Sequence, residues 1–163
     1  MLEEVQICER SRKNPHRNIA AYHGCEVKDG RITGIYFTKY TETLMQRVNP
    51  GKLGKRPFAS QVRRGMSDEV QRWMDGVESG MRHLHSLGIL HNDINPSNIM
   101  LDGNIPVIID FDSCGQEGHS LGTVKRTYEW YDENVKEAMP SNDIDALEEM
   151  RMWLLGDTAK LKF

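Results

Sequence analysis

This 163-residue chain has few cysteines, no long apolar run and little net charge. Its three cysteines, Cys8, Cys25 and Cys114, are widely spaced and form no CxxC pair, so they indicate neither a disulfide framework nor a cysteine zinc site. No apolar run approaches the roughly 20 residues that a membrane-spanning helix needs. The net charge of −3 provides no general attraction to nucleic acid.

The chain begins Met-Leu-Glu-Glu, which is acidic at once and unlike a secretory signal. Free cysteines are typical of reducing compartments. We therefore expect a cytoplasmic protein with no membrane partner and no nucleic-acid partner. Its hydrophobic content of 38% and charged content of 28% are those of a globular domain rather than a disordered chain.

The hydrophobic pattern alternates between helical and strand-like periods, which predicts an α+β fold. The expected helices cover residues 2–10, 44–48, 67–85 and 143–155, and the expected strands cover residues 19–27, 31–40, 99–101 and 107–109. The third helix is the clearest, because Ser67 has N-cap character, apolar residues recur every three or four positions, and Gly88 follows as a helix stop. The stretch from Asn49 to Arg64, with its prolines, glycines and basic residues, predicts a solvated surface linker.

The most informative segment is His91-Asn92-Asp93-Ile94-Asn95-Pro96-Ser97-Asn98, followed by Ile108-Ile109-Asp110-Phe111-Asp112. A turn between the two apolar runs predicts a hairpin that brings Asp93, Asn98 and Asp110 toward one point. Mg²⁺ prefers hard oxygen ligands, and Asp110 and Asn98 suit that role. Asp93 is then free to accept a proton from a hydroxyl group. These are the residue types that phosphoryl transfer from a nucleotide requires.

This pattern resembles the catalytic loop (H-R-D-x-x-x-x-N) and the metal motif (D-F-G) of eukaryotic protein kinases, and most of all divergent kinase-like proteins of fungi. The resemblance covers almost the whole chain. It implies a protein-kinase-like fold with a truncated N-lobe, made of a C-helix and a β-hairpin, and a mainly helical C-lobe ending near the F-helix. We expect one partial domain, in which residues 1–40 form the remnant N-lobe and hinge and residues 41–163 the partial C-lobe.

The resemblance also implies ATP and Mg²⁺ as cofactors and gives roles to particular residues. Asp93 and Asn95 are the expected catalytic-loop positions, and Asn98 and Asp110 the expected metal ligands. The nucleotide contacts that it implies are Thr38 as gatekeeper, Lys39 and Thr41 in the hinge, Met100, and Ile109. The supporting residues that it implies are Glu4 of the C-helix, His91, and Asp143 at the start of the F-helix.

The departures from the kinase pattern are informative. Asn92 replaces the usual arginine, so activation by phosphorylation through that residue is not expected. Asn95 replaces a lysine that steadies the transferred phosphate, and Asp112 replaces a glycine. The chain shows neither a glycine-rich loop nor a strand lysine to pair with Glu4. We therefore expect phosphate transfer by this chain to be slow or absent.

The leading functional hypothesis is an ATP-dependent protein phosphotransferase of the serine/threonine type, acting on a protein substrate. One alternative is a small-molecule kinase of the aminoglycoside or choline type, since those relatives share H-x-D-x-x-x-x-N and lack the lysine that Asn95 replaces. A second alternative is a non-catalytic pseudokinase that acts through binding.

Overall fold

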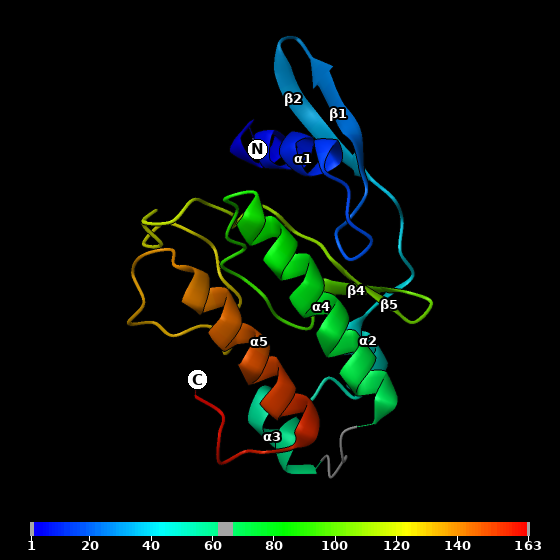
Figure 1. The fold of residues 1–163 in the computed structure, drawn as a ribbon, viewed down its shortest axis with the longest axis vertical. Helices are drawn as coiled ribbons and strands as arrows, with labels where there is room; N and C mark the ends of the chain where they lie inside the picture. Colours follow the sequence, from blue (N-terminus) through cyan, green and yellow to red (C-terminus); the bar gives the residue numbers. More distant parts are fainter. Residues whose placement is uncertain (1, 62–66, 163) are drawn as a thin grey trace.

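The structure is a computed structural model that describes residues 2–61 and 67–162. Its small lobe consists of helix α1 (Leu2–Lys13) and an antiparallel hairpin of β1 (Tyr22–Lys28) and β2 (Arg31–Phe37). Asp29 and Gly30 form the hairpin turn with positive φ angles of 51° and 73°. The hairpin projects away from the rest of the molecule, with α1 against its base (Figure 1).

The larger lobe is mainly helical. Its elements in chain order are β3 (Glu42–Thr43), α2 (Leu44–Val48), α3 (Lys55–Gln61), α4 (Asp68–Ser86), β4 (Ile99–Asp102), β5 (Ile105–Ile108) and α5 (Pro140–Leu155). The three strands form one antiparallel sheet in the order β3-β4-β5. Helices α4 and α5 run side by side (Figure 1), and α4 also packs on β5. The expected α+β, kinase-like architecture is thus confirmed.

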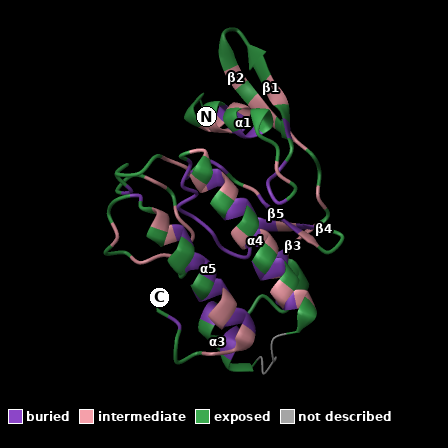
Figure 2. Cartoon of the chain, viewed as in Figure 1, coloured by how far each residue is buried: buried purple, intermediate pink, exposed green. Residues whose placement is uncertain are grey.

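Helix α4 forms where the periodicity predicts it. Ser67 caps it by accepting a hydrogen bond from the Val70 backbone N–H at 3.2 Å, and Gly88 follows it with a φ of 69°. The apolar residues of the expected stripe are all buried against the strands and α5: Val70, Trp73, Met74, Val77, Met81 and Leu84. Figure 2 shows this buried face turned inward and the exposed face turned to solvent.

A short bridging segment ties the small lobe to the larger one. Ile19 pairs with Ile108 in a parallel bridge, so it joins β5 and not the hairpin, and the strand expected from Ile19 begins instead at Tyr22. The segment approaches α4 closely because Gly80 has no side chain. A Cβ at Gly80 would lie 2.8 Å from the Asn18 carbonyl oxygen.

The linker expected from Asn49 to Arg64 is wrong in its central part, because residues 55–61 form α3. Lys55 is buried rather than solvated, and its ammonium pairs with Glu149 of α5. The carbonyl of Lys55 accepts a hydrogen bond from the Trp153 indole at 3.1 Å. Arg63 and Arg64, which contributed to the basic character of the expected linker, lie outside the described residues.

Helix α5 begins at Pro140, three residues before the expected start, and its buried face forms part of the main core. Phe58 of α3 and Trp130 both pack on Trp153, with ring centroids 4.2 and 5.3 Å away. Phe58 and Trp130 therefore cover the face of α5 that carries Trp153. Among the described residues, no helix is both long enough and apolar enough to cross a membrane.

Candidate active site

Asp143 holds the loop that precedes β4. Its carboxylate is 1% exposed and accepts hydrogen bonds from the backbone N–H groups of His91 and Asn92, each at 2.8 Å. The His85 ring nitrogen lies 2.8 Å from the same carboxylate. A buried carboxylate requires such partners, since burial without them is costly. Helix α5 therefore fixes the backbone of the loop just before Asp93.

His91 is fully buried and joins the loop to the end of β5. Its Nε2 lies 3.0 Å from the carbonyl oxygen of Ile109, and its Nδ1 lies 3.3 Å from the backbone N–H of Asp93. A neutral ring that donates from Nε2 and accepts at Nδ1 satisfies both contacts. The His91 ring thus contacts both Asp93 and Ile109, so it links the loop that contains Asp93 to the segment that contains Asp110.

Asp93 and Asn98 are in direct contact. The Asn98 amide donates from Nδ2 to the Asp93 carboxylate and to its carbonyl, each at 3.0 Å, which leaves Asn98 Oδ1 without a hydrogen-bond partner among the described residues. Thr127 donates to the same carboxylate from its backbone N–H and its hydroxyl, both at 2.8 Å. Asp93 is therefore held from two sides while 8% of its surface stays accessible.

Asn95 does not face open space, which differs from its expected catalytic position. It is fully buried, and its amide donates to the Asp93 carbonyl and the Thr127 hydroxyl, each at 3.0 Å. Its Oδ1 accepts the backbone N–H of Ser97 at 2.9 Å. The Asn95 side chain therefore hydrogen-bonds inside the loop and supports Asp93 and Thr127.

Asp110 follows β5 with a φ of 67°, a strained value for a residue with a side chain. Loss of hydration, and then the neighbouring Asp112 carboxyl, raise the pKa of Asp110, and the charge of Asp93 adds to the effect. The Asp110 and Asp112 carboxyls lie within hydrogen-bonding reach of each other. The Ile109 backbone N–H donates to the Asn98 carbonyl at 3.0 Å, so the residue before Asp110 lies against the loop in which Asn98 contacts Asp93.

A pocket of about 360 Å³ opens beside Asp110. Its lining combines five residues expected at a nucleotide site with three apolar or aromatic neighbours: Glu4, Thr38, Met100, Ile109 and Asp110, with Ala20, Phe37 and Tyr40. The volume lies in the range of small-ligand pockets. Lys39 and Thr41 are exposed and flank Tyr40 at the rim, and neither lines the pocket.

Glu4 faces this pocket from α1. Partial burial raises its pKa, and the charges of Asp112 and Asp110 raise it further. Within the described residues, Glu4 forms no ion pair with a lysine or arginine. The pocket lining therefore includes two carboxylates, Glu4 and Asp110, and neither is paired with a lysine or arginine of the described residues.

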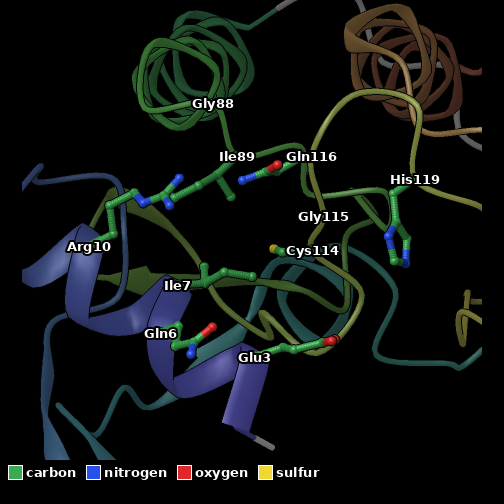
Figure 3. Close-up of a pocket in the computed structure, with 10 residues that line it drawn as sticks. All are labelled: Glu3, Gln6, Ile7, Arg10, Gly88, Ile89, Cys114, Gly115, Gln116 and His119. Carbon is green, nitrogen blue, oxygen red and sulfur yellow. The ribbon is translucent and has the colours of Figure 1, made fainter.

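A separate cavity of about 240 Å³ lies beneath α1, between that helix and the segment after Asp112 (Figure 3). Ile7, Ile89 and Cys114 contribute its apolar side, and the Cys114 sulfur points into it (Figure 3). Burial raises the pKa of the Cys114 thiol well above its ordinary value. This cavity contains none of the expected site residues, so it is distinct from the pocket beside Asp110.

Thr127 and His85 are site residues that the sequence reasoning missed. Thr127 lies 34 positions after Asp93, and His85 lies 58 positions before Asp143. Each contact exists only because the chain folds back on itself.

A small lobe of one helix and a hairpin above a helical lobe, with a polar loop and hairpin between them, is a protein-kinase-like arrangement. The chain matches the family model described as "Protein kinase domain" over residues 1–152, and it belongs to the protein kinase family.

Individual relatives agree with this assignment. The chain is 35% identical over 159 residues to serine/threonine-protein kinase Tao of Drosophila melanogaster, covering 97% of this chain and 14% of that protein. It is 30% identical over 106 residues to serine/threonine-protein kinase PLK4 of Xenopus laevis, covering 58% of this chain and 10% of that protein. It is 42% identical over 95 residues to inactive serine/threonine-protein kinase PLK5 of Mus musculus, covering 58% of this chain and 14% of that protein. The chain thus spans 10 to 14% of the length of these relatives.

Proposed function

We propose that this chain binds ATP with Mg²⁺ in the pocket beside Asp110 and that its parent activity is phosphate transfer to serine or threonine in a protein substrate. In this proposal residues 1–40 act as a remnant N-lobe and hinge, and residues 41–163 as a partial C-lobe. Two observations carry the proposal: the contact of Asp93 with Asn98 in the loop, and Asp110 in the lining of a pocket of small-ligand size.

The donor set suits a magnesium ion bound together with a nucleotide. Asn98 Oδ1 is open, and Asp110 carries negative charge that no cation of the described residues pairs with. Within those residues, no group of three or more His, Cys, Asp or Glu is arranged to hold a metal. Asn98 and Asp110 would therefore hold the ion together with phosphate oxygens and water, as Mg²⁺ sites commonly do. The ion would offset the charge of the phosphates.

Asp93 is the proposed residue that orients and deprotonates the acceptor hydroxyl. Thr127 and Asn98 occupy Oδ2, whereas Oδ1 accepts only the Thr127 backbone N–H and keeps a lone pair. A general base of this kind lowers the barrier mainly by being correctly positioned. A carboxylate that is already fixed by hydrogen bonds does not have to reorganise when the acceptor hydroxyl binds.

A non-catalytic binding role is the second candidate, and Glu4 is the observation that favours it. Glu4 has no lysine partner among the described residues, so the lysine–glutamate pair that would hold the nucleotide phosphates on the α1 side of the pocket is not formed there. Transfer by this chain should then be slow even where nucleotide binds.

Thermal unfolding with ATP, with and without Mg²⁺, tests the proposal. We expect Mg²⁺-dependent stabilisation that grows with ligand concentration and that Asp110→Asn removes while leaving the fold intact. Asp102→Asn is the matched control, because Asp102 is an exposed carboxylate at the far end of the same hairpin. Stabilisation that persists in Asp110→Asn would refute the proposed site. A radiolabelled-ATP assay with Asp93→Asn as blank separates binding from transfer.

A further inference from the structure

The cavity beneath α1, which we call the α1 cavity, has an apolar floor (Figure 3). Ile89 is 2% exposed, and Ile7 and Cys114 are partly buried against the main core. Burial raises the pKa of the Cys114 thiol, so the sulfur stays neutral and adds to the apolar surface. The cavity has a volume of about 240 Å³, so a small apolar group that entered it would leave water.

Arg10 brings a positive charge to the edge of the α1 cavity. Its Nη1 donates a hydrogen bond to the Leu87 carbonyl at 3.1 Å, which holds the side chain across from α1 to the residue before Gly88. Within the described residues, no carboxylate forms an ion pair with Arg10, whereas Arg12 on the same helix pairs with Glu9 at 2.8 Å. A guanidinium group has five N–H donors, so most of those of Arg10 remain open to a ligand.

A carboxamide approaches the same point from the larger lobe. In Figure 3 the side chains of Arg10 and Gln116 both point toward Ile89, from opposite sides of the view. The Gln116 side chain forms no hydrogen bond among the described residues, so its N–H₂ group is free to donate. A guanidinium and an amide donor at one place suit a carboxylate, because hydrogen bonds to an ionised group are about twice as strong as neutral ones.

Among the described residues, Glu3 is the one carboxylate that lines the α1 cavity. It precedes Arg10 by seven residues, so the two lie on one face of α1 but about 10 Å apart along the helix axis. Figure 3 shows the Glu3 side chain extending away from Arg10, toward the side on which His119 lies. The negative and positive groups are therefore at opposite ends of the cavity, and the Arg10 end favours an anion.

We propose that the α1 cavity binds a small monocarboxylic acid, with its carboxylate on Arg10 and Gln116 and a compact apolar body against the floor. The volume is below the roughly 300–1,000 Å³ of drug-sized pockets, so the apolar body is limited to about one ring or a short branched chain. An inorganic anion is a poorer ligand, because it would leave the apolar floor uncovered. The α1 cavity shares no lining residue with the pocket beside Asp110, so this inference does not rest on the proposed function.

A ligand in the α1 cavity would connect the two lobes. Arg10 belongs to α1, whereas Ile89 and Gln116 belong to the larger lobe. Binding would therefore hold α1 against the larger lobe, and it should raise the melting temperature as the concentration of the acid increases.

The test is a titration of the purified chain without nucleotide, followed through the backbone amide signals in NMR spectra. Phenylacetate is the probe, and phenylacetamide is its neutral twin of nearly the same shape. We expect phenylacetate to bind about fivefold more tightly than phenylacetamide, with the largest shifts at Ile7, Ile89 and Gln116. Acetate has the charge without the ring, so acetate and inorganic phosphate should each bind about fivefold more weakly than phenylacetate, or worse.

Variants of α1 supply the second arm. Arg10→Gln should weaken phenylacetate to the level of phenylacetamide and leave phenylacetamide unchanged, and Arg10→Lys should recover part of the preference because the charge remains. Arg12→Gln is the matched control, since it makes the same change two positions later, outside the α1 cavity.

Equal affinity for phenylacetate and phenylacetamide would overturn the inference. Equal effects of Arg10→Gln and Arg12→Gln, equal binding of inorganic phosphate, or largest shifts at residues outside the lining would also overturn it. Failure of ATP to bind would instead refute the proposed function and leave the α1 cavity standing, because the two sites have separate linings.

Discussion

Asp143 offers the sharpest test of how the larger lobe holds the candidate base. Replacing it with asparagine keeps the shape and removes the charge. One side-chain oxygen becomes an N–H₂ group, so the backbone N–H of either His91 or Asn92 then faces a donor and loses its acceptor. A buried unsatisfied N–H costs about 1–3 kcal/mol, and the lost charge-assisted bonds add to it. We expect Asp143→Asn to lower the free energy of unfolding by about 3–5 kcal/mol.

Asp145→Asn is the matched control, because it makes the same chemical change two positions later on the same helix. Asp145 is half exposed, and its pair with Lys162 lies on the surface, where such pairs are worth about 0–1 kcal/mol.

Urea unfolding, followed by the fluorescence of the buried tryptophans, measures both variants. Hydrogen exchange at residues 91–93 should also speed up only in Asp143→Asn, since those amides lose their partner. Equal stability losses in Asp143→Asn and Asp145→Asn would refute the role given to Asp143.

Three further outcomes are expected. Lys55→Met should lower the free energy of unfolding by about 3–5 kcal/mol in urea titrations, because it removes one partner of a buried ion pair. Burial, and then the His83 ring stacked 4.9 Å away, lower the pKa of His16 in the folded protein. The contribution of His16 to the free energy of unfolding is therefore complete above pH ~6.5 and is lost as the pH falls through the lower folded pKa. His16→Gln should reduce this acid-dependent loss, measured as urea midpoints across the same pH range. Gly80→Ala should lower the melting temperature, at a cost of about 1–3 kcal/mol, because its Cβ would lie 2.8 Å from a backbone oxygen; an unchanged melting temperature would contradict this packing.

The catalytic-loop motif was readable from the sequence because its residues are close together along the chain. Asp93 and Asn98 are five positions apart, and a tight hairpin returns the chain to Asp110. Such geometry depends on local turns, which residue types predict well. The apolar stripe of α4 was equally readable, since its period directly reports the buried face.

The regions that could not be predicted depend on contacts between distant segments. Prolines, glycines and basic residues made residues 49–64 resemble a linker, yet α3 forms there because Phe58 and Lys55 are buried against α5. Tertiary packing overrides local propensity in such cases. The contact of the Asn95 amide with Thr127 could not be predicted for the same reason, because the two residues are 32 positions apart.

The charges around the site give a physical reason to expect slow phosphate transfer. Glu4, Asp110 and Asp112 influence one another's charge, and no lysine or arginine of the described chain pairs with them. A nucleotide triphosphate is itself strongly negative, so its binding must rely on metal ions to offset both sets of charges. Hydrogen bonds from Thr127 and Asn98 hold Asp93 regardless of any nucleotide. Under the proposed function, the side of the site that receives the acceptor hydroxyl is therefore preorganised, whereas the nucleotide side depends on bound metal ions; we therefore propose that this chain binds a substrate more readily than it phosphorylates it.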